Sequence, residues 1–301
     1  MREKMTDPCN LCPRHCNADR AVQAGYCGMP DTILVSRAAL HMWEEPVISG
    51  EHGSGTVFFA GCNLKCIFCQ NYEIAHKTSE ARYKAVSEEE LCDLFFKLKE
   101  KGAHNINLVT PTHYIPQIRK ALLLAKDKGL GLPVVYNTSS YENVDALRML
   151  AGLVDVYLPD LKYTDPAIAA EYSHAPDYFE TATAAIEEMF RQVGEPDFDG
   201  DLMKKGIIVR HLVLPGHTND SKAVLKYLYE TYHDRIYISI MNQYTPMERM
   251  KTHPLLGRRI TGREYERVVN YALDLGIQNA FIQEGDVAKE SFIPPFDLTG
   301  L

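Results

Sequence analysis

The chain has 301 residues, of which 46% are hydrophobic and 24% are charged, so it can bury a large core and is neither disordered nor fibrous by composition. Its 32 basic and 40 acidic residues give a formal net charge of -8, which disfavours a nucleic-acid partner. No apolar run approaches the roughly 20 residues that cross a bilayer, and no apolar segment follows the charged start, so we expect a cytoplasmic protein without a membrane partner.

The first 50 residues show no regular alternation of elements and contain four cysteines. Cys9, Cys12, Cys16 and Cys27 have the spacing C-x2-C-x3-C-x10-C. Four soft ligands can close a tetrahedral zinc site or hold an iron-sulfur cluster, and both remain open. We therefore expect residues 1–50 to form a Cys-rich metal-binding extension, with reduced structural thiols or a redox switch as the alternative. Trp43 is expected to anchor this extension against the rest of the chain.

From residue 51 to residue 301, short β-branched or aromatic runs alternate with segments of helical period. A capping box at Ser87 and Glu90 begins one helix, and another covers about 264–275 and ends at Gly276. This alternation predicts one α/β domain over 51–301 with a parallel sheet, either a partial or complete barrel or a doubly wound sheet. The predicted strands are 56–60, 105–109, 133–136, 154–158, 207–212, 235–240 and 279–282.

Unusual residues follow the first four of these strands. They occupy positions 62–69, 110–114, 137–141 and 159–162. Because both candidate architectures place their chemistry at the carboxyl ends of parallel strands, we expect these segments to meet at one end of the sheet. Gln283 and Glu284 follow the last strand and are candidates for substrate contact. The Gly-, Asp- and Pro-rich segment 193–206 is expected to be an inserted loop.

Three further cysteines lie within eight residues, directly after the first strand of the alternation. Cys62, Cys66 and Cys69 can hold three corners of a 4Fe-4S cluster and leave the fourth iron without a protein ligand. An open iron can bind a small molecule. A zinc site completed by His76 is the alternative. Cys92 stands alone at a helical position and is expected to be a buried thiol.

The C-x3-C-x2-C spacing after a first strand, with an aromatic residue before the last cysteine, resembles the signature of radical S-adenosylmethionine (SAM) enzymes. This resemblance implies a partial (β/α)6-type TIM barrel. It also implies a 4Fe-4S cluster whose open iron binds SAM. In that family a reduced cluster cleaves SAM to a 5'-deoxyadenosyl radical, which abstracts hydrogen from the substrate.

The resemblance extends over about residues 50 to 290 and is closest to the pyruvate formate-lyase activating enzyme-like branch. Asp160 and Lys162 are similar to the D-x-K motif of that branch, whose lysine reaches the carboxylate of SAM. Arg210, followed by Pro215-Gly216, is similar to an arginine that contacts the same cofactor. Asn137 stands near the cofactor in this comparison, and with Asp160 it can hold a monovalent cation.

Two segments depart from the branch. Where it has a Gly-Gly-Glu segment that binds the amino group of SAM, this chain has Val109-Thr-Pro-Thr-His-Tyr114, so Thr110 and Thr112 are the candidate contacts. The Asp-Gly-Pro-Gly stretch of typical glycyl-radical activases is also replaced, by Gly50-Glu-His-Gly-Ser-Gly55. The chain is most similar to the PflX-like subgroup.

These residues together predict a radical SAM oxidoreductase of the activating-enzyme type. Its partners would be SAM, a reductant such as flavodoxin or ferredoxin, and a substrate that is a glycyl-radical enzyme, a peptide or a metabolite. The alternative is an iron-sulfur or zinc electron-transfer protein without SAM chemistry. A basic run from Arg249 to Arg267, interrupted by glutamates, is interpreted as a solvated helix face.

Overall fold

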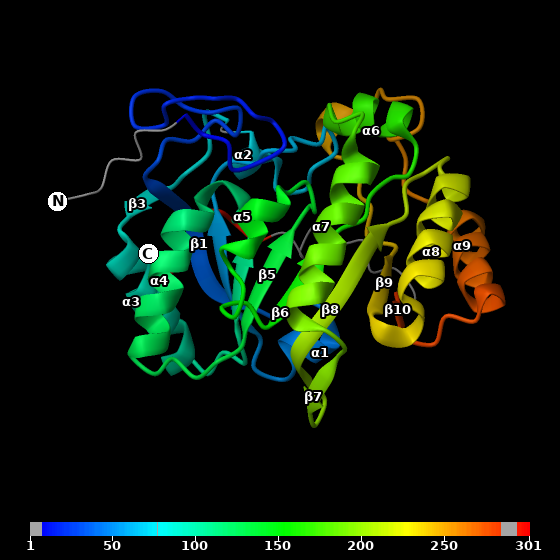
Figure 1. Cartoon of the computed structure of the whole chain (residues 1–301). Coiled ribbons are helices and arrows are strands. Elements are labelled where there is room, and N and C mark those ends of the chain that lie inside the picture. Colours follow the sequence, from blue (N-terminus) through cyan, green and yellow to red (C-terminus); the bar gives the residue numbers. More distant parts are fainter. Residues whose placement is uncertain (1–7, 77, 284–293) are drawn as a thin grey trace.

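One sheet of mostly parallel strands organises the chain, and helices lie over its outer face (Figure 1). A computed structural model describes residues 8–76, 78–283 and 294–301. The strand order is β10-β9-β8-β6-β5-β4-β2-β1-β3, and β7 pairs with β8. The strands are β1 Ile33–His41, β2 Ser54–Phe59, β3 Lys84–Val86, β4 Ile106–Val109, β5 Val134–Thr138, β6 Val156–Pro159, β7 Asp197–Asp199, β8 Leu202–Leu212, β9 Tyr237–Met241 and β10 Ala280–Ile282.

The seven strands predicted from the sequence are confirmed as β2, β4, β5, β6, β8, β9 and β10, and each pairs in parallel with its neighbours in this series. Within the described residues, the edge strands β10 and β3 do not pair with each other. The sheet is therefore open, and the predicted α/β fold with a partial barrel is confirmed.

Two parts of the sheet were not predicted. β1 pairs antiparallel with β2 and with β3, so the first 50 residues contribute a strand to the sheet. The expected inserted loop at 193–206 is wrong, because β7 and the start of β8 form an antiparallel hairpin there. Gly200, at a φ of 60°, makes the tight turn between the two strands. The Gly- and Asp-rich composition suits such a turn as well as a loop, so composition alone does not distinguish the hairpin from a loop.

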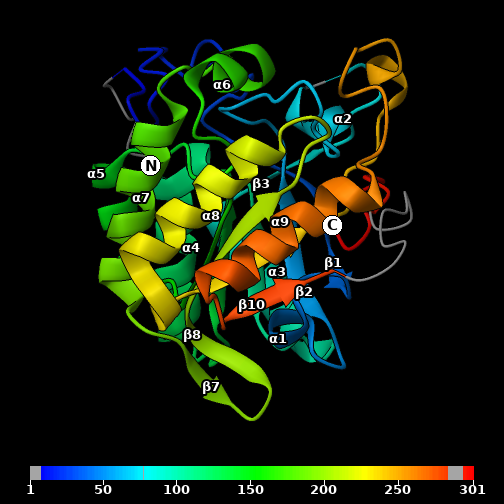
Figure 2. The same ribbon diagram turned by 90° about the vertical axis from the view of Figure 1, so that its right-hand side faces the viewer.

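Helices α3, α4, α5 and α7 lie side by side over one face of the sheet, and α8 packs beside α9 (Figures 1 and 2). The predicted capping box of α3 is present, and α9 ends at the left-handed Gly276 as expected. The helices are α1 Pro46–Ser49, α2 Tyr72–Ala75, α3 Glu88–Glu100, α4 Ile115–Asp127, α5 Val144–Arg148, α6 Pro166–Ser173, α7 Tyr178–Val193, α8 Thr218–Tyr232 and α9 Gly262–Leu275. Short 3-10 turns occupy Thr112–Tyr114, His233–Arg235 and Glu248–Met250.

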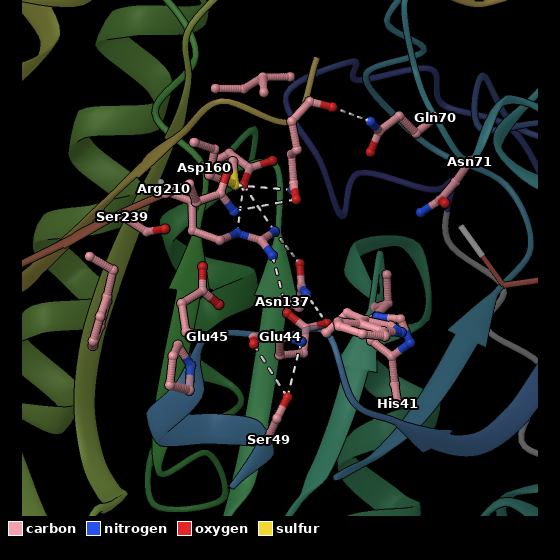
Figure 3. Close-up of a pocket in the computed structure, with 18 of the residues that line it drawn as sticks. His41, Glu44, Glu45, Ser49, Gln70, Asn71, Asn137, Asp160, Arg210 and Ser239 are labelled. Carbon is pink, nitrogen blue, oxygen red and sulfur yellow. Dashed lines mark hydrogen bonds and ion pairs between the residues drawn. The ribbon is translucent and has the colours of Figure 1, made fainter. Parts of the chain in front are cut away.

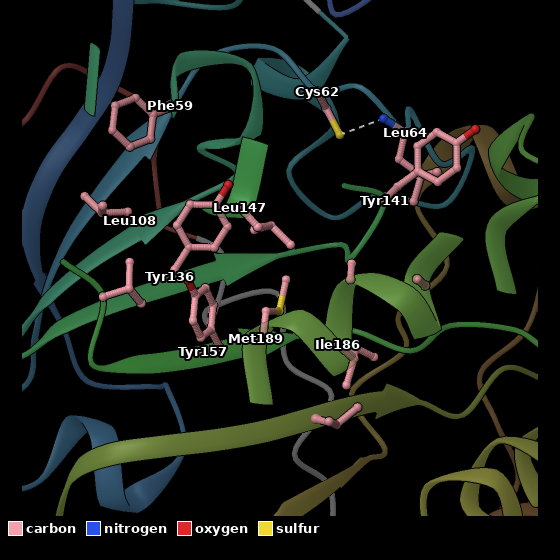
Figure 4. Packing of buried hydrophobic residues seen from close by; sticks show 14 of the residues in the cluster. Phe59, Cys62, Leu64, Leu108, Tyr136, Tyr141, Leu147, Tyr157, Ile186 and Met189 are labelled. Atoms are coloured by element: carbon pink, nitrogen blue, oxygen red, sulfur yellow. Dashed lines mark hydrogen bonds between the residues drawn. The ribbon is translucent and has the colours of Figure 1, made fainter. Parts of the chain in front are cut away.

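The main core fills the space between the sheet and these helices (Figure 4). Tyr136 and Tyr157 meet edge to face at a centroid distance of 5.7 Å, and Leu147 and Met189 pack beside them from α5 and α7. Cys92 is fully buried in α3, as expected. Such aromatic pairs add to the stabilisation that burial of their area provides. In the described parts of the chain, no helix is both long enough and apolar enough to cross a membrane.

The short helix α1 lies at the foot of the sheet, opposite the end where α2 and the Cys-rich segment lie (Figure 1). A Cβ atom on Gly50, which follows α1, would lie 2.8 Å from His104 and from Leu202. His104 precedes β4 and Leu202 begins β8, so the chain passes the amino ends of the parallel strands here. The two ends of the sheet thus receive side chains from different segments.

Candidate active site at the carboxyl ends of the strands

The three clustered cysteines lie on the loop that leaves β2. Gly61 has a φ of 86°, and a Cβ atom there would lie 2.9 Å from the carbonyl of Cys27, so only glycine fits this approach. Two groups donate hydrogen bonds to sulfur: Ser173 Oγ to Cys66 Sγ at 3.0 Å, and the Leu64 backbone N–H to Cys62 Sγ at 3.4 Å. Donors aimed at sulfur are the environment that a metal-bound thiolate needs.

This donor set fits a cluster better than a single metal ion. All eight cysteines are free thiols. In the described parts of the chain, no group of three His, Cys, Asp or Glu side chains is arranged to hold one metal ion. His76, the candidate fourth zinc ligand, instead stacks on Tyr72 and turns Nε2 to the Cys66 carbonyl at 3.3 Å. The thiolates of a cubane bind separate irons, so they stand farther apart than four ligands around one zinc ion.

Burial raises the pKa of the Cys66 thiol and raises that of Cys69 to about 12, while the charge of Lys162 acts in the opposite direction on both. Metal coordination is what deprotonates a thiol in such surroundings.

Four residues that the sequence predicted as cofactor contacts meet beside this loop. Asp160 Oδ2 accepts a hydrogen bond from Lys162 Nζ at 2.6 Å, and its other oxygen forms an ion pair with Arg210 at 2.9 Å. Arg210 also donates to Asn137 Oδ1 at 2.6 Å. These residues end β5, β6 and β8, which confirms that the carboxyl ends of these strands bring them together.

The charges of this group stabilise one another. Burial alone would raise the pKa of Asp160, but Arg210 and Lys162 outweigh it and hold the pKa below its usual value. Burial alone would lower the pKa of Lys162, and Asp160 reverses that effect. All three side chains are therefore ionised at neutral pH, and Lys162 has a fixed position from which to meet an anionic group.

Two buried glutamates complete the network, and sequence reasoning missed both. Glu44 Oε1 accepts a hydrogen bond from Asn107 Nδ2 at 3.0 Å, and Glu44 Oε2 lies 3.4 Å from Arg210. Glu45 is the next residue and is 9% exposed. A Glu-Glu pair outside the β/α alternation is typical of a surface segment, so its burial is not expected from the sequence. The signal that could have found the pair is Pro46, which directly follows it, begins a helix and so fixes the backbone direction at Glu45.

These residues line one cavity of about 1020 Å³ (Figure 3). The cavity is also lined by Cys66 and Cys69, by Gln243 and Gln283 after the last strands, and by Trp43. The expectation that Trp43 anchors the extension is wrong, because Trp43 is 60% exposed and lines this cavity. Glu284 lies outside the described residues.

Three predicted features, the contacts of Thr110 and of Thr112 and a monovalent cation, are not supported by the described lining of this cavity and stay predictions. Thr110 and Thr112 are not among its described lining residues. The Thr112 hydroxyl instead donates to Glu142 Oε1 at 2.6 Å. The proposed monovalent cation would use Asn137 and Asp160, but their oxygens are already held by Arg210 and Lys162.

The amino-terminal cysteines lie beside the loop that contains Cys62, Cys66 and Cys69. Cys9, Cys12 and Cys27 are buried and Cys16 is exposed. A Cβ atom on Gly25 would lie 3.3 Å from Cys16 Sγ and 3.6 Å from Cys27 Sγ, so these two sulfurs flank one glycine. Burial raises the pKa of Cys12 and of Cys27, and the charge of Cys9 raises both further, which shows that the thiols share one region.

Arg14 fastens this segment to the cysteine loop. Its guanidinium donates to the carbonyls of Asn63 at 2.8 Å, Leu64 at 3.2 Å and Ser173 at 2.9 Å. It also lies over the Tyr26 ring at 4.4 Å. The two cysteine groups therefore belong to one packed unit.

Comparison with known proteins shows the family of the chain. The model of the Radical SAM superfamily matches residues 56–228, which is more than half of the chain and includes the cysteine loop and Arg210. The uncharacterized protein MJ0674 of Methanocaldococcus jannaschii is 30% identical over 277 residues, covering 89% of this chain and 76% of that protein.

Similar solved structures share the fold at low identity. HydG, a maturase of the FeFe hydrogenase, is 16% identical with a TM-score of 0.53, covering 77% of this chain and 52% of that chain. SuiB of Streptococcus suis bound to S-adenosylmethionine is 17% identical with a TM-score of 0.51, covering 75% of this chain and 48% of that chain. Methylornithine synthase is 15% identical with a TM-score of 0.50, covering 73% of this chain and 60% of that chain.

Proposed function

Since the chain belongs to the radical SAM superfamily, we propose that the loop from Cys62 to Cys69 holds a 4Fe-4S cluster and that the adjoining cavity binds SAM. The family implies an enzyme with both cofactors. The observation that carries the assignment to these residues is their convergence: Cys66 and Cys69 line the same cavity as Asp160, Lys162 and Arg210. An electron-transfer protein without SAM chemistry would have no use for that charged group beside the cysteine loop.

Each side chain has a definite task in this proposal. Lys162, held by Asp160, offers an ammonium group to the carboxylate of SAM. Arg210 fixes Asp160 and Asn137 in place and faces the same cavity. The apolar side chains of Phe68 and Met241 line the cavity and exclude water from the reacting groups. When bound and reduced, the cluster supplies the electron that cleaves SAM to methionine and a 5'-deoxyadenosyl radical.

The substrate loses a hydrogen atom to that radical. We propose a member of the activating-enzyme-like branch, of the PflX-like subgroup, because Asp160, Lys162 and Arg210 follow its motif order and meet in space. The substrate class implied by the branch is a glycyl-radical enzyme, a peptide or a metabolite.

The amino-terminal cysteines form a second metal centre in this proposal. Four thiols within one region, fastened to the loop by Arg14, are the ligands that a zinc ion or a second iron-sulfur cluster would use, although among the described residues they are not already arranged around one metal ion. Free thiols in two clusters fit a reducing compartment such as the cytoplasm, where flavodoxin or ferredoxin can act as the reductant.

Reductive cleavage of SAM tests the function. Anaerobically reconstituted protein with dithionite and SAM should form 5'-deoxyadenosine and methionine in equal amounts. The Cys62→Ala/Cys66→Ala/Cys69→Ala triple variant should form neither. A triple variant with full cleavage activity would remove the assignment, and a wild-type protein with a loaded cluster and no product would favour the electron-transfer alternative.

A further inference from the structure

More acidic than basic side chains face the cavity. Among the described residues that line it, three carboxyl groups, from Glu44, Glu45 and Asp160, stand beside the two cations Lys162 and Arg210. His41 adds no positive charge, because burial lowers its pKa to about 4. Burial raises the pKa of Glu44 and of Glu45, so a cation brought by a ligand would stabilise the charged form of either group.

Glu45 is the least satisfied of the three carboxyl groups, although the charge of Arg210 and a hydrogen bond with Ser239 both lower its pKa against the effect of burial. Asp160 is paired with both cations, and Glu44 is held by Asn107 and Arg210. Glu45 Oε2 is buried and has no hydrogen-bond partner among the described residues. Leaving a buried carboxylate oxygen without a donor costs its full desolvation penalty, so such an oxygen is typical of a site that receives a donor from a ligand.

Glu45 comes to the cavity from a different segment than the cysteine loop. The loop follows the carboxyl end of β2, whereas Glu45 directly precedes α1 and hydrogen-bonds with Ser239, in the middle of β9. In Figure 3, Glu44 and Glu45 lie below Arg210, on the side away from Gln70, the residue that follows Cys69.

We propose that Glu45 binds a protonated amine or guanidinium group of the substrate. This inference rests on the proposed function, because the substrate would share the cavity with SAM. The cationic group belongs either to a free small molecule or to a side chain of a polypeptide, and both would present the same N–H donors to Glu45 Oε2. Ser239 also lines the cavity and hydrogen-bonds to the carboxyl group of Glu45, which holds that group in place for the ligand.

Binding of matched probes tests the inference. Reconstituted full-length protein, saturated with SAM and kept unreduced, is titrated in a calorimeter with L-lysine and its neutral counterpart L-norleucine, and with L-arginine and L-citrulline. A second arm uses the tripeptide N-acetyl-Gly-Lys-Gly-amide and its norleucine counterpart. In at least one arm the cationic probe should bind roughly 10- to 100-fold more tightly than its neutral counterpart. The arm that shows this preference identifies the free or the polypeptide source.

Variants at one position then localise the effect. Glu45→Gln removes the charge at constant volume and should abolish the preference, whereas Glu45→Asp should retain part of it. Glu51→Gln, on an exposed turn, is the matched control and should bind as the wild type does. Equal binding of cationic and neutral probes to the wild type in both arms would overturn the inference even if Glu45→Gln failed to fold. A preference that survives in Glu45→Gln would also overturn it.

The same preparation separates this inference from the proposed function. If dithionite yields 5'-deoxyadenosine but the cation preference is absent, only the assignment of Glu45 is wrong. If the loaded wild-type protein yields no 5'-deoxyadenosine, the proposed function itself is wrong.

Discussion

Lys162 and Arg210 share one carboxylate, yet the structure gives them different surroundings. Lys162 forms an ion pair with Asp160, whereas Arg210 also reaches Glu44 and Asn137. We therefore expect Lys162→Ala to weaken SAM binding roughly 10- to 100-fold with little effect on the cluster, because a charged hydrogen bond is lost. Arg210→Ala should weaken SAM binding by a similar factor and also leave Glu44 without its cation.

Anaerobic calorimetry, with cluster absorbance followed in parallel, measures this effect. Lys226→Ala, on the exposed side of α8, is the control and should bind SAM as the wild type does. Unchanged affinity in both active-site variants would mean that these residues do not contact SAM, even if the cysteine assignment stands.

The buried carboxyl group of Glu142 should make the free energy of unfolding depend on pH. Burial raises its pKa from 4.5 to about 7, although the hydroxyls of Thr112, Thr138 and Tyr136 act in the opposite direction. The native protein then holds a proton that the unfolded chain releases, so the free energy of unfolding falls as the pH rises from about 4.5 to about 7.

Relative to Glu142→Gln, the wild type should lose on the order of 1 to 3 kcal/mol of stability between pH 5 and pH 8. Urea unfolding of both proteins at the two pH values measures the difference. Glu100→Gln, at the exposed end of α3, should show no such change. An identical pH response in wild type and Glu142→Gln would show that Glu142 titrates normally.

At the scale of single residues, the sequence predicted the group at the strand ends but not the group opposite it. Asp160, Lys162 and Arg210 could be predicted because each follows or ends a recognisable strand. Glu44 and Glu45 could not, because their burial depends on contacts with Asn107, Arg210 and Ser239 on distant strands. No local pattern encodes such a long-range contact.

At the scale of elements, the short 3-10 turn Glu248–Met250 braces the cysteine loop. Arg249 donates to the carbonyls of Ile67 and Cys69, each at 2.9 Å, and its guanidinium lies 3.4 Å from the Tyr72 ring centroid. For this residue, the interpretation of the basic run as a solvated helix face is wrong. The sequence could not show it, because the contact joins segments about 180 residues apart.

Arg249→Ala should therefore loosen the loop. Two charge-assisted hydrogen bonds are lost, so we expect iron to pass to a chelator roughly tenfold faster than in the wild type. Arg259→Ala, on an exposed residue of the same basic run, serves as the control. Equal rates of iron loss in the two variants would show that the turn does not stabilise the loop.

The amino-terminal group should bind metal independently of the loop. In the Cys62→Ala/Cys66→Ala/Cys69→Ala variant, elemental analysis should still find zinc or iron at about one centre per chain, as four thiol ligands require. Adding Cys9→Ala and Cys12→Ala should remove that metal. A well-folded triple variant without metal would contradict a second centre.

The strands themselves illustrate what periodicity predicts. The seven parallel strands are buried runs between helices, which the sequence shows clearly. β1, β3 and β7 are antiparallel, lie at or near edges or in a hairpin, and contain polar or charged residues. Their pairing is decided by the neighbouring strand, so it could not be predicted from their own composition.

At the scale of the whole molecule, the open sheet supplies one cavity that several distant segments line. The cysteine loop and Lys162 reach it from the carboxyl ends of the strands, and Glu44 and Glu45 reach it from the segment before α1. The amino-terminal cysteines pack against the cysteine loop, where Cys27 approaches Gly61. This arrangement brings both cysteine groups to the side of the cavity where we propose that SAM binds.

The central claim is that three cysteines leave one iron open for SAM next to Lys162. Electron paramagnetic resonance of the reduced protein, recorded before and after SAM is added, tests it most directly, because a ligand on the open iron changes the spectrum of that cluster. The Cys9→Ala/Cys12→Ala variant, in which the cluster of the loop is observed alone, should show this change, and Cys92→Ala should show it as the wild type does. A fully loaded and reduced cluster whose spectrum is the same with and without SAM would contradict the account.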